Sequence, residues 1–348
     1  MSSILRDQVI SSVDQYISGQ LQTRVASAGT IHARYQDLWQ HISEATLFGG
    51  KRFRPYLTMV GYGEFSETII PIAASQELIH TAMLVHDDVI DQDTMRRGQK
   101  NINGKYYDEY SAFSSPELAT HYSYAASILA GDALVSEAYI AIANSDVAND
   151  IKTLLMQRLH LSIFEVTGGE LIDTEASIFN TVTFDPLTIY RYKTAGYSFI
   201  GPLISGALCA RADAETLHTL EQYGIAAGIG FQLQDDLLGV FGNEQELGKS
   251  VLIDLREGKQ THLALRHRAL MNPEQATRFN EYFGNVDATD EQLTHLRDDI
   301  EASGARTETE QLVEDYFAEA RSASQRITND SQREELTALL GMLERRKA

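Results

Sequence analysis

The sequence of 348 residues contains one cysteine, Cys209, and few basic side chains. A single thiol cannot form an internal disulfide, so the chain does not depend on an oxidising compartment, and we expect a cytoplasmic protein. There are 29 Lys and Arg against 49 Asp and Glu, which gives a formal net charge of −20. Such a balance opposes binding to nucleic acid or to anionic lipid, so we expect neither as a partner.

Long apolar runs are also missing. No stretch approaches the roughly 18 consecutive apolar residues that a membrane-spanning helix requires. The first twenty residues, MSSILRDQVISSVDQYISGQ, carry acidic and polar side chains throughout, unlike a signal peptide. We therefore expect neither a membrane span nor a signal peptide.

Strand patterns and linkers are missing too, which favours one all-α domain. Alternating apolar and polar residues joined by Asn-Gly or Asp-Gly turns, the mark of hairpins, do not occur. No linker rich in Pro, Gly or Ser divides the chain, and 43 % of the residues are apolar, enough for a large core. We expect a single-domain bundle of long helices over residues 1–348.

What is present is helical periodicity. Apolar residues three or four positions apart predict an N-terminal helix over 1–28, at Ile4, Leu5, Val9, Ile10, Val13, Tyr16 and Ile17. We interpret it as an arm that packs on the core or on a second subunit, because its polar face has too few basic residues for a membrane-surface helix. Residues 67–93 predict one long helix with Pro71 in its first turn. Further helices are expected at 117–144, 148–176, 186–210, 213–241, 258–272, 290–302, 305–328 and 331–345. The segment 98–116 looks most like a loop.

Acidic residues cluster at the end of the helix predicted over 67–93, in the sequence HDDVIDQDTMRRG. Asp87 and Asp91 are four residues apart and so project from one helix face, where two carboxylates repel each other. Mg²⁺ can offset that repulsion, because it binds a few carboxylate oxygens and completes its shell with water and substrate phosphates. The alternative is a solvated helix end that only adds solubility.

A second acidic cluster lies in a strongly apolar helix, GFQLQDDLLG, and contains Gln232, Asp235 and Asp236. Acidic residues this deep in an apolar pattern are rarely decorative. If the two acidic helices face each other, their carboxylates form opposed walls that can hold several metal ions. A buried aspartate bonded to a neighbouring helix is the structural alternative.

Basic residues are grouped rather than scattered. No Lys or Arg occurs between Arg54 and Arg96, or between Lys105 and Lys152. Arg binds phosphate oxygens bidentately and Lys acts as a point charge, so the groups at 51–54 and 96–97 suit a diphosphate. Together with the acidic clusters they indicate a site for a metal–diphosphate complex, although a structural salt-bridge network would also use both signs.

Five motifs in order resemble the trans-isoprenyl diphosphate synthases, also called polyprenyl synthetases. They are GGKRFRP (49–55), IHTAMLVHDDVIDQDTMRRG (79–98), YKTAG (192–196), GFQLQDDLLG (230–239) and LGKSVLIDLREGKQT (247–261). The motif-bearing core thus covers about 49–261. The resemblance implies the isoprenoid synthase fold, an all-α bundle around a central hydrophobic cavity, and a homodimer. It implies transfer of an allylic group from its diphosphate to isopentenyl diphosphate.

The resemblance also implies residue roles. Isopentenyl diphosphate would be bound by Lys51, Arg54, His80 and Arg97. Asp87, Asp91 and Asp235 would ligate magnesium, three ions in all, bridging to the allylic diphosphate. That diphosphate would be held directly by Arg96, Lys193, Lys249 and Lys259. Thr194 and Gln232 would line the reacting centre.

One motif departs from the family's pattern. Many members carry DDxxD in the second acidic motif, whereas this chain has Gly239 in the fifth position. Asp235 remains as the expected metal contact, so we expect catalysis to survive. His86 beside Asp87 is interpreted as a packing residue rather than a base.

Product length in the family depends on side chains just before the first acidic motif, here Ala82 and Met83. Neither is aromatic, so the tunnel should extend beyond a fifteen-carbon product, and we favour geranylgeranyl diphosphate. Ile79, Leu78 or groups from a facing helix around 122–128 would close the tunnel. Longer all-trans polyprenyl products are the main alternative. The allylic primer can be dimethylallyl, geranyl or farnesyl diphosphate.

Two other functions use similar residues. A class I terpene cyclase shares the first acidic motif, but it has no need for the second diphosphate site that GGKRFRP and Arg97 imply. A non-catalytic partner subunit would show degraded metal motifs, whereas both Asp pairs are intact here.

Overall fold

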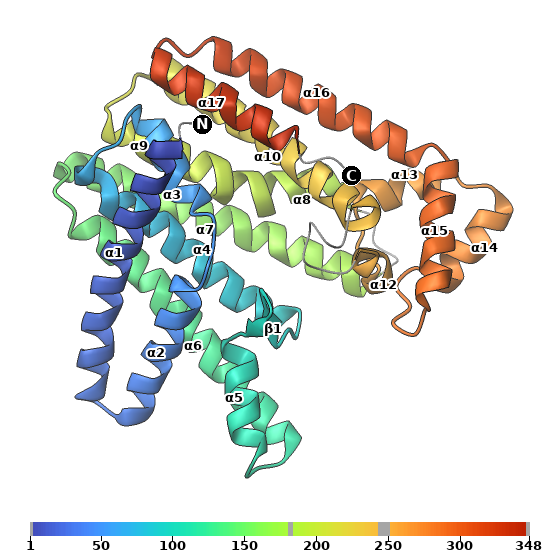
Figure 1. Cartoon of the computed structure of the whole chain (residues 1–348), viewed down its shortest axis with the longest axis horizontal. Helices are drawn as coiled ribbons and strands as arrows, with labels where there is room; N and C mark the ends of the chain where they lie inside the picture. Colours follow the sequence, from blue (N-terminus) through green and yellow to red (C-terminus); the bar gives the residue numbers. More distant parts are fainter. Residues whose placement is uncertain (1–2, 180–183, 243–250, 346–348) are drawn as a thin grey trace. The chain divides into compact units, whose positions relative to one another are not determined.

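The computed structural model describes residues 3–179, 184–242 and 251–345, and the chain divides into two compact units (Figure 1). Unit 1 is the chain up to Leu159 together with Gly201–Ala212, and unit 2 is His160–Ile200 together with the chain from Asp213 onward. The single domain expected over 1–348 stays a prediction. The all-α fold class is confirmed.

Unit 1 contains ten elements and the start of a long helix, α7 (Asn149–Ile178), that continues into unit 2. Its elements are α1 (Ser3–Gly29), α2 (Ala33–Leu47), α3 (Phe53–Tyr62), the 3-10 turn η1 (Glu67–Ile69), α4 (Ile70–Ile90), β1 (Met95–Arg96), β2 (Gln99–Lys100), α5 (Ile102–Ser111), α6 (Pro116–Ala143) and α9 (Gly201–Cys209). The helix predicted over 67–93 is thus confirmed as η1 followed by α4, with Pro71 in the first turn of α4.

The described part of unit 2 consists of helices joined by turns and loops, without strands. Beside the rest of α7 it contains α8 (Pro186–Ile189), the π-helix η2 (Tyr190–Ile200), α10 (Ala214–Phe241), α12 (Ile253–Glu257), α13 (His262–Leu270), α14 (Pro273–Tyr282), α15 (Asp290–Ala302), α16 (Ala305–Gln325) and α17 (Asp330–Leu343). The helical segment predicted over 186–210 is confirmed as three consecutive helical elements, α8, η2 and α9, of which the middle one is π-helical.

The loop expected at 98–116 is also wrong. It contains β2 and the helix α5, which begins where the Asn101 side chain accepts a hydrogen bond of 2.8 Å from the Gly104 N–H. Tyr106 of α5 is buried, and its ring lies 5.8 Å from that of Tyr122 on α6. The cap and the burial of Ile102 and Tyr106 thus stabilise a helix with little apolar periodicity.

The N-terminal helix α1 packs within unit 1. Its side chains Val9, Val13, Ile17 and Leu21 are fully buried, one per helical turn. Gln20 and Arg24 also bond to the buried carboxylate of Glu137 on α6, at 2.5 and 2.6 Å. The arm expected over 1–28 is therefore a packing arm in the described part of unit 1.

A close crossing of α3 and α9 supports α4, which carries the first acidic motif and bonds to α9. A Cβ at Gly61 of α3 would lie 2.1 Å from the carbonyl oxygen of Leu203 on α9, and one at Gly206 of α9 would lie 1.9 Å from that of Thr58. Glycine is therefore needed at both positions. Gln76 of α4 bonds to Ser205 of α9 at 3.4 Å.

Two helical segments, Glu67–Ile90 and Pro116–Ala143, are long and apolar enough to cross a membrane by length and composition alone. In the first, 72 % of the relevant window is buried inside the structure, as in the core helix of a folded domain. In the second the share is 50 %, so α6 leaves part of its apolar surface open.

In unit 2, α10 packs against both η2 and α16. A Cβ at Gly228 would lie 2.5 Å from Ala195 of η2, and one at Gly230 would lie 2.8 Å from the ring of Phe317 on α16. The Tyr223 hydroxyl donates to the carbonyl of Leu336 on α17 at 2.9 Å. These contacts hold the second acidic motif in the interior of the unit.

Candidate active site

The segment GGKRFRP forms the turn that leads into α3. Gly49 and Gly50 have φ angles of +67° and +98°, and Arg52 has φ +47°, so the backbone is left-handed at three of four successive residues. A Cβ at Gly50 would lie 3.0 Å from the Arg52 guanidinium and 3.4 Å from that of Arg97. The glycines therefore let two arginines approach the same stretch of backbone.

Arg52 anchors this turn to neighbouring helices by a buried side chain. Its side chain is 2 % exposed and donates to Glu77 at 2.8 Å, to Asp14 at 2.6 Å and to the Thr46 carbonyl at 3.1 Å. A buried ion pair of this geometry fixes the direction of the chain on either side of it. Lys51 and Arg54, the predicted ligands, flank this anchored residue; Lys51 is exposed and Arg54 is partly buried.

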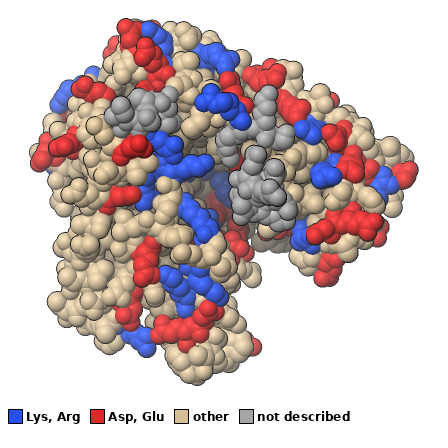
Figure 2. All heavy atoms as spheres, viewed as in Figure 1, with Lys and Arg blue, Asp and Glu red and all other residues tan. Residues whose placement is uncertain are grey.

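The two arginines of the first motif lie on a tight hairpin. β1 and β2 pair antiparallel, with Arg96 opposite Gln99, so that Arg97 and Gly98 form a two-residue turn with φ angles of +53° and +76°. This conformation is typical of a type I′ turn. Adjacent arginines thereby point in different directions. In the space-filling view, basic side chains gather around this hairpin, with acidic ones beside them (Figure 2).

Arg96 is held by the acidic end of α4. Its guanidinium donates to Asp88 at 2.8 Å and to Asp87 at 3.1 Å. Asp88 is buried, which raises the pKa of its carboxyl, and Arg96 and Asn101 bond to it. Asp88, for which the sequence predicts only a supporting or helix-end role, thus orients Arg96.

Arg97 reaches towards the glycine turn instead. It donates to the Phe48 carbonyl at 3.0 Å, and burial together with the charges of Arg52, Arg96 and Arg54 lowers the pKa of its guanidinium. Burial, then the charges of Arg54, Arg97, Arg96 and Arg52, likewise hold the pKa of His80 well below 6.5. His80 is therefore neutral at pH 7 in a strongly electropositive region suited to a polyanion.

Asp87 and Asp91 lie one turn apart at the end of α4, as predicted; Asp91 caps the helix and its N–H donates to the Asp87 carbonyl at 2.8 Å. His86 beside them packs on α6, where a Cβ at Gly131 would lie 2.1 Å from its Nε2, and where the Ile128 carbonyl is 3.4 Å away. This geometry agrees with a packing residue rather than a base.

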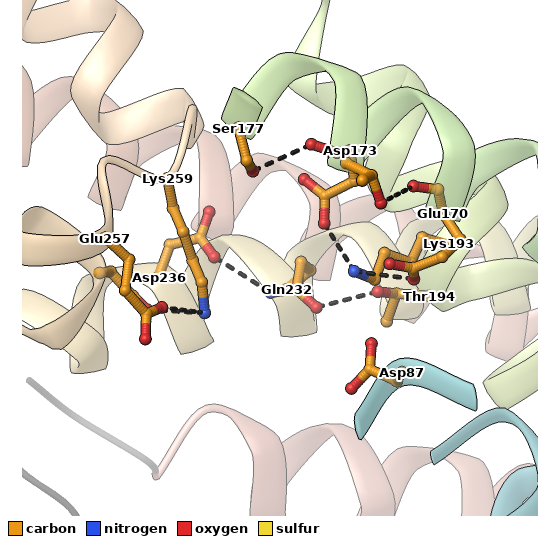
Figure 3. Close-up of polar contacts among 12 residues, drawn as sticks. Asp87, Glu170, Asp173, Ser177, Lys193, Thr194, Gln232, Asp236, Glu257 and Lys259 are labelled. Carbon is orange, nitrogen blue, oxygen red and sulfur yellow. Dashed lines mark hydrogen bonds and ion pairs between the residues drawn. The ribbon is translucent and has the colours of Figure 1, made fainter. Parts of the chain in front are cut away.

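The second site, in unit 2, is a chain of hydrogen bonds around the buried Asp236 (Figure 3). Thr194 of η2 donates to Gln232 of α10 at 2.9 Å, and Gln232 donates to Asp236 at 3.0 Å. The Tyr190 hydroxyl donates to the other oxygen of Asp236 and accepts from the His262 N–H at 2.8 Å. Asp236 therefore orients Gln232 and Thr194, and burial raises the pKa of its carboxyl to about 8.

Lys193 lies on the same π-helix and faces α7. Its ammonium is 2.9 Å from Glu170 and 2.6 Å from Asp173 (Figure 3). A Cβ at Gly169 would lie 2.4 Å from the Lys193 backbone nitrogen, so glycine permits this close approach. π-helical turns occur mostly at functional sites, since one extra residue re-aims the side chains that follow.

Lys259 follows α12, and its ammonium lies 3.2 Å from both Asp254 and Glu257. Burial alone would lower the pKa of Lys259, but the two carboxylates outweigh it and raise that pKa. Asp235 sits beside Asp236 on α10. Lys249, the remaining predicted ligand, lies outside the described residues.

The structure thus brings the predicted residues into two groups, one in each unit. Lys51, Arg54, His80, Asp87, Asp91, Arg96 and Arg97 belong to unit 1, and Lys193, Thr194, Gln232, Asp235 and Lys259 belong to unit 2. Arg52 and Asp88 lie in the predicted motifs, but their contacts were not predicted. Glu170, Asp173 and Tyr190 were missed, although Glu170 and Asp173 had a visible signal, two acids three apart in an apolar helix.

The carboxylate oxygens of these residues are donors that suit a magnesium ion. Within 3–179, 184–242 and 251–345, no group of three or more His, Cys, Asp or Glu side chains is arranged to hold a metal ion alone. Mg²⁺ does not need such a cage, because it takes one or two carboxylates and is completed by water and phosphate oxygens. Asp87 and Asp91, one turn apart, supply such a pair.

Comparison with known proteins gives the same answer as the motifs. The family model described as polyprenyl synthetase matches residues 36–300. A short chain isoprenyl diphosphate synthase from Methanocaldococcus jannaschii is 31 % identical over 264 residues, 74 % of each chain. A geranylgeranyl diphosphate synthase from Sulfolobus acidocaldarius is 29 % identical over 289 residues, covering 81 % of this chain and 82 % of that one.

A solved structure extends the similarity to the whole chain. The geranylgeranyl pyrophosphate synthase of Corynebacterium glutamicum, complexed with isoprenyl diphosphate and magnesium, superposes with a TM-score of 0.90 at 28 % identity, over 98 % of this chain and 99 % of that one. The chain therefore belongs to the polyprenyl synthetase family, and it is a trans-prenyltransferase.

Proposed function

We propose that this enzyme elongates an allylic diphosphate with isopentenyl diphosphate in the presence of Mg²⁺ and that its main product is geranylgeranyl diphosphate. The main support for assigning these residues to diphosphate binding is the group of positive charges around His80 in unit 1. Four arginines surround the neutral His80 there, and Gly50 leaves room for two of them beside the backbone. A diphosphate is the ligand that such a group favours.

In this proposal, Lys51, Arg54, His80 and Arg97 bind isopentenyl diphosphate. Arg97 presents a fork fixed by its hairpin turn, and neutral His80 donates a hydrogen bond without adding charge. Arg96 binds the allylic diphosphate, with Asp87 and Asp88 holding its guanidinium until substrate arrives. These roles depend on side chains held in place before binding.

The groups of unit 2 act on the allylic diphosphate. Lys193, Lys259 and Lys249 hold its oxygens, and Asp235 joins Asp87 and Asp91 as a magnesium ligand, with three ions in all. Magnesium, when bound, neutralises the charge that develops on diphosphate as the carbon–oxygen bond breaks. Thr194 and Gln232 are oriented through Asp236 and place polar oxygens beside the allylic carbon.

The carbon chemistry needs little more from the protein. The electron pair of the isopentenyl double bond attacks the allylic carbon, a new carbon–carbon bond forms, and a proton then leaves to the departed diphosphate. The enzyme supplies orientation and exclusion of water. This agrees with the neutral His80 and with a His86 that packs on α6 rather than facing substrate.

Product length is inferred from the helix below the first motif. Ala82, Ile79 and Leu78 of α4 are buried, and Ala82 carries the smallest side chain of the three. Because α4 and α6 run in opposite directions (Figure 1) and His86 lies at Gly131, the α6 residues level with Ala82 come after Gly131, not at 122–128. Leu134 and Ala138, both buried, are the better candidates to close a tunnel.

The product assay is the primary test. Purified protein with Mg²⁺, isopentenyl diphosphate and labelled farnesyl diphosphate should yield mainly a twenty-carbon prenol after dephosphorylation. Nothing beyond fifteen carbons would contradict the tunnel, and a ladder of longer prenols would favour the polyprenyl alternative. Hydrocarbon release from geranylgeranyl diphosphate alone would indicate a cyclase. Turnover only after adding a second protein would indicate a partner subunit.

A single substitution tests the tunnel directly. Ala82→Phe fills space on α4 and should shift the product to fifteen carbons or fewer. Ala138→Gly, which removes volume on α6, serves as the opposite change and should lengthen the product or leave it unchanged. An unaltered distribution in Ala82→Phe would show that residue 82 does not line the tunnel.

We also propose a homodimer. In unit 2, α7 exposes a line of large apolar side chains three or seven residues apart, Leu161, Phe164, Leu171 and Ile178, with Phe164 69 % exposed. In unit 1, α6 exposes Leu118, Tyr122 and Leu129. Apolar lines of this length on exposed helix faces are typical of subunit interfaces, and a second copy offers the same lines in return.

The oligomeric state can be measured by light scattering after gel filtration. We expect twice the mass of 38.8 kDa for the natural chain and monomers for Phe164→Glu. Val286→Glu, at an apolar residue that is 74 % exposed away from α7, should stay dimeric as the control. A dimeric Phe164→Glu would remove α7 from the interface.

A further inference from the structure

The second acidic motif has glycine, Gly239, at its fifth residue in place of aspartate. The carboxylate of another residue, Asp254, lies beside that glycine. On α10, positions 235 and 239 are four residues apart and share one helix face. A Cβ built at Gly239 would lie 2.3 Å from Oδ2 and 3.3 Å from Cγ of Asp254. The Asp254 carboxylate thus fills the volume into which a side chain at 239 would project.

The approach of Asp254 is fixed by the backbone. The Leu252 N–H donates to the Gly239 carbonyl at 2.9 Å, and Leu252 adopts φ +76° just before α12 begins. Leu252 and Leu255, on either side of Asp254, are both buried, and α12 packs against α10. The side chain of Asp254 is itself only 14 % exposed.

Asp254 also positions a cation. Its Oδ1 lies 3.2 Å from the Lys259 ammonium, and its carbonyl accepts from the Lys259 N–H at 3.0 Å. One carboxylate therefore contacts the face of α10 with one oxygen and Lys259 with the other. A purely local salt bridge would not require the glycine beneath it.

We propose that Asp254 supplies the acidic group that the motif lacks, and that Gly239 is present to make room for it. The proposal rests on the proposed function of the second site. Asp254 acts as a positioning residue for the magnesium–diphosphate complex: it replaces the fifth carboxylate on the face of Asp235 and aims Lys259 at the diphosphate. Restoring the family's aspartate at 239 without removing Asp254 therefore harms the site.

The test measures Mn²⁺ binding in the presence of inorganic diphosphate, from the electron paramagnetic resonance signal of free Mn²⁺, with no turnover involved. Asp254→Asn should weaken binding about 10-fold to 100-fold, the usual cost of removing a group that supports a metal ligand. Gly239→Ala should weaken it similarly, because the new Cβ displaces the Asp254 carboxylate. Gly19→Ala, where nothing lies within 4 Å, is the matched control and should bind as the natural chain does.

Double variants separate this proposal from a loss of folding. If Gly239→Ala acts through Asp254, then Gly239→Ala combined with Asp254→Asn should bind no more weakly than Asp254→Asn alone. The Gly239→Asp variant should bind Mn²⁺ weakly. Adding Asp254→Ala to it should raise the affinity for Mn²⁺ at least tenfold. Thermal unfolding of each variant reports whether the fold persists.

Two results would overturn the proposal: Asp254→Asn that binds Mn²⁺ and diphosphate like the natural chain, or Gly239→Asp that binds more tightly with Asp254 in place. The Asp235→Asn variant distinguishes failure of the Asp254 proposal from failure of the proposed function. If Asp235→Asn also binds normally, the proposed function of the second site is wrong. If only Asp235→Asn loses binding, Asp254 is a structural residue and the proposed function stands.

Discussion

The two units hold their cations by different means. In unit 1 most of the cations are arginines, and two of them have left-handed backbone, Arg52 at φ +47° and Arg97 at φ +53°. In unit 2 they are lysines. Lys193 lies on a π-helix beside Thr194, which donates to Gln232 of α10, and Gln232 is oriented by the hydrogen bond that it donates to the buried Asp236. Unit 1 is thus organised by backbone conformation, and unit 2 by side chains that contact one another.

The difference extends to the acidic partners. Arg52 and Glu77 form a pair shielded from water, while the Lys193 and Lys259 side chains are 28 % and 48 % exposed. A guanidinium fork bonds in fixed directions, whereas an ammonium is a point charge on a flexible stem that exchanges partners readily. We infer that unit 1 receives its diphosphate rigidly and that the lysines of unit 2 leave their carboxylates when a metal–diphosphate complex binds.

The largest expected effect comes from the carboxylates proposed as metal ligands in each unit. Asp87→Asn and Asp235→Asn should each lower kcat about 10³-fold, since each removes several kcal/mol of electrostatic stabilisation of the leaving diphosphate. Steady-state turnover with labelled isopentenyl diphosphate measures this, with circular dichroism to confirm folding. A large loss in one variant and full activity in the other would confine metal binding to one unit.

The next effect is on the stability of unit 1. Glu77→Gln leaves the buried Arg52 with Asp14 as its remaining carboxylate, and breaking a buried ion pair costs about 3 kcal/mol or more of unfolding free energy. Asp150→Asn, which breaks the exposed pair with Arg211, is the control and should cost less than about 1 kcal/mol. Urea unfolding measures both. Equal losses would mean that burial of the Arg52 pair does not matter.

A third prediction concerns exchanging arginine and lysine at the two proposed diphosphate sites, which should change KM for one substrate at a time. Arg97→Lys loses a bidentate, charge-assisted contact worth about 1.5–3 kcal/mol, so KM for isopentenyl diphosphate should rise about tenfold or more. KM for the allylic diphosphate should stay the same. Lys193→Arg should do the reverse and leave KM for isopentenyl diphosphate unchanged. A rise of both KM values in either variant would show that the two substrates share that cation.

The sequence predicted the helices that carry the motifs better than the contacts among the side chains. The helices α4, α6, α7 and α10 follow from apolar periodicity over 20 to 30 residues, because burying one face is what stabilises a long helix. Short α5 has little such periodicity and is held by the Asn101 cap and the buried Tyr106, so it was expected as a loop. The π-helix η2 has no periodic signature that distinguishes it from an α-helix.

The motifs predict binding of diphosphate and magnesium, but they do not show which of several adjacent charged residues is buried and which faces the site. In KRFR, burial of Arg52 rather than its neighbours follows from the left-handed backbone after Gly49 and Gly50. In HDDVID, Asp88 turns inward to Arg96 because it lies on the buried side of α4. The place of Asp254 beside Gly239 is a contact between residues that are not neighbours in the sequence, which no local pattern encodes.

The smallest expected effect is a pair of opposite pH dependences in metal-free protein. Burial raises the pKa of Asp236 to about 8, above its unfolded value near 4. The folded state then binds the proton and the unfolded state does not, so the contribution of Asp236 is full below about pH 4 and is lost as pH rises towards 8. His80 has a folded pKa below 6.5, so its contribution is present above 6.5 and is lost as pH falls.

Unfolding free energies in urea and a chelator, at pH values from 5 to 8, test the contrast. Asp236→Asn should flatten the decline towards pH 8, and His80→Gln should flatten the decline on the acid side of pH 6.5. A protonated His80 would be buried and repelled by the charges of four arginines, whereas an ionised Asp236 would be buried away from water, so the two slopes have opposite signs for different physical reasons. If both variants changed the slope in the same direction, one of these two environments would be wrong.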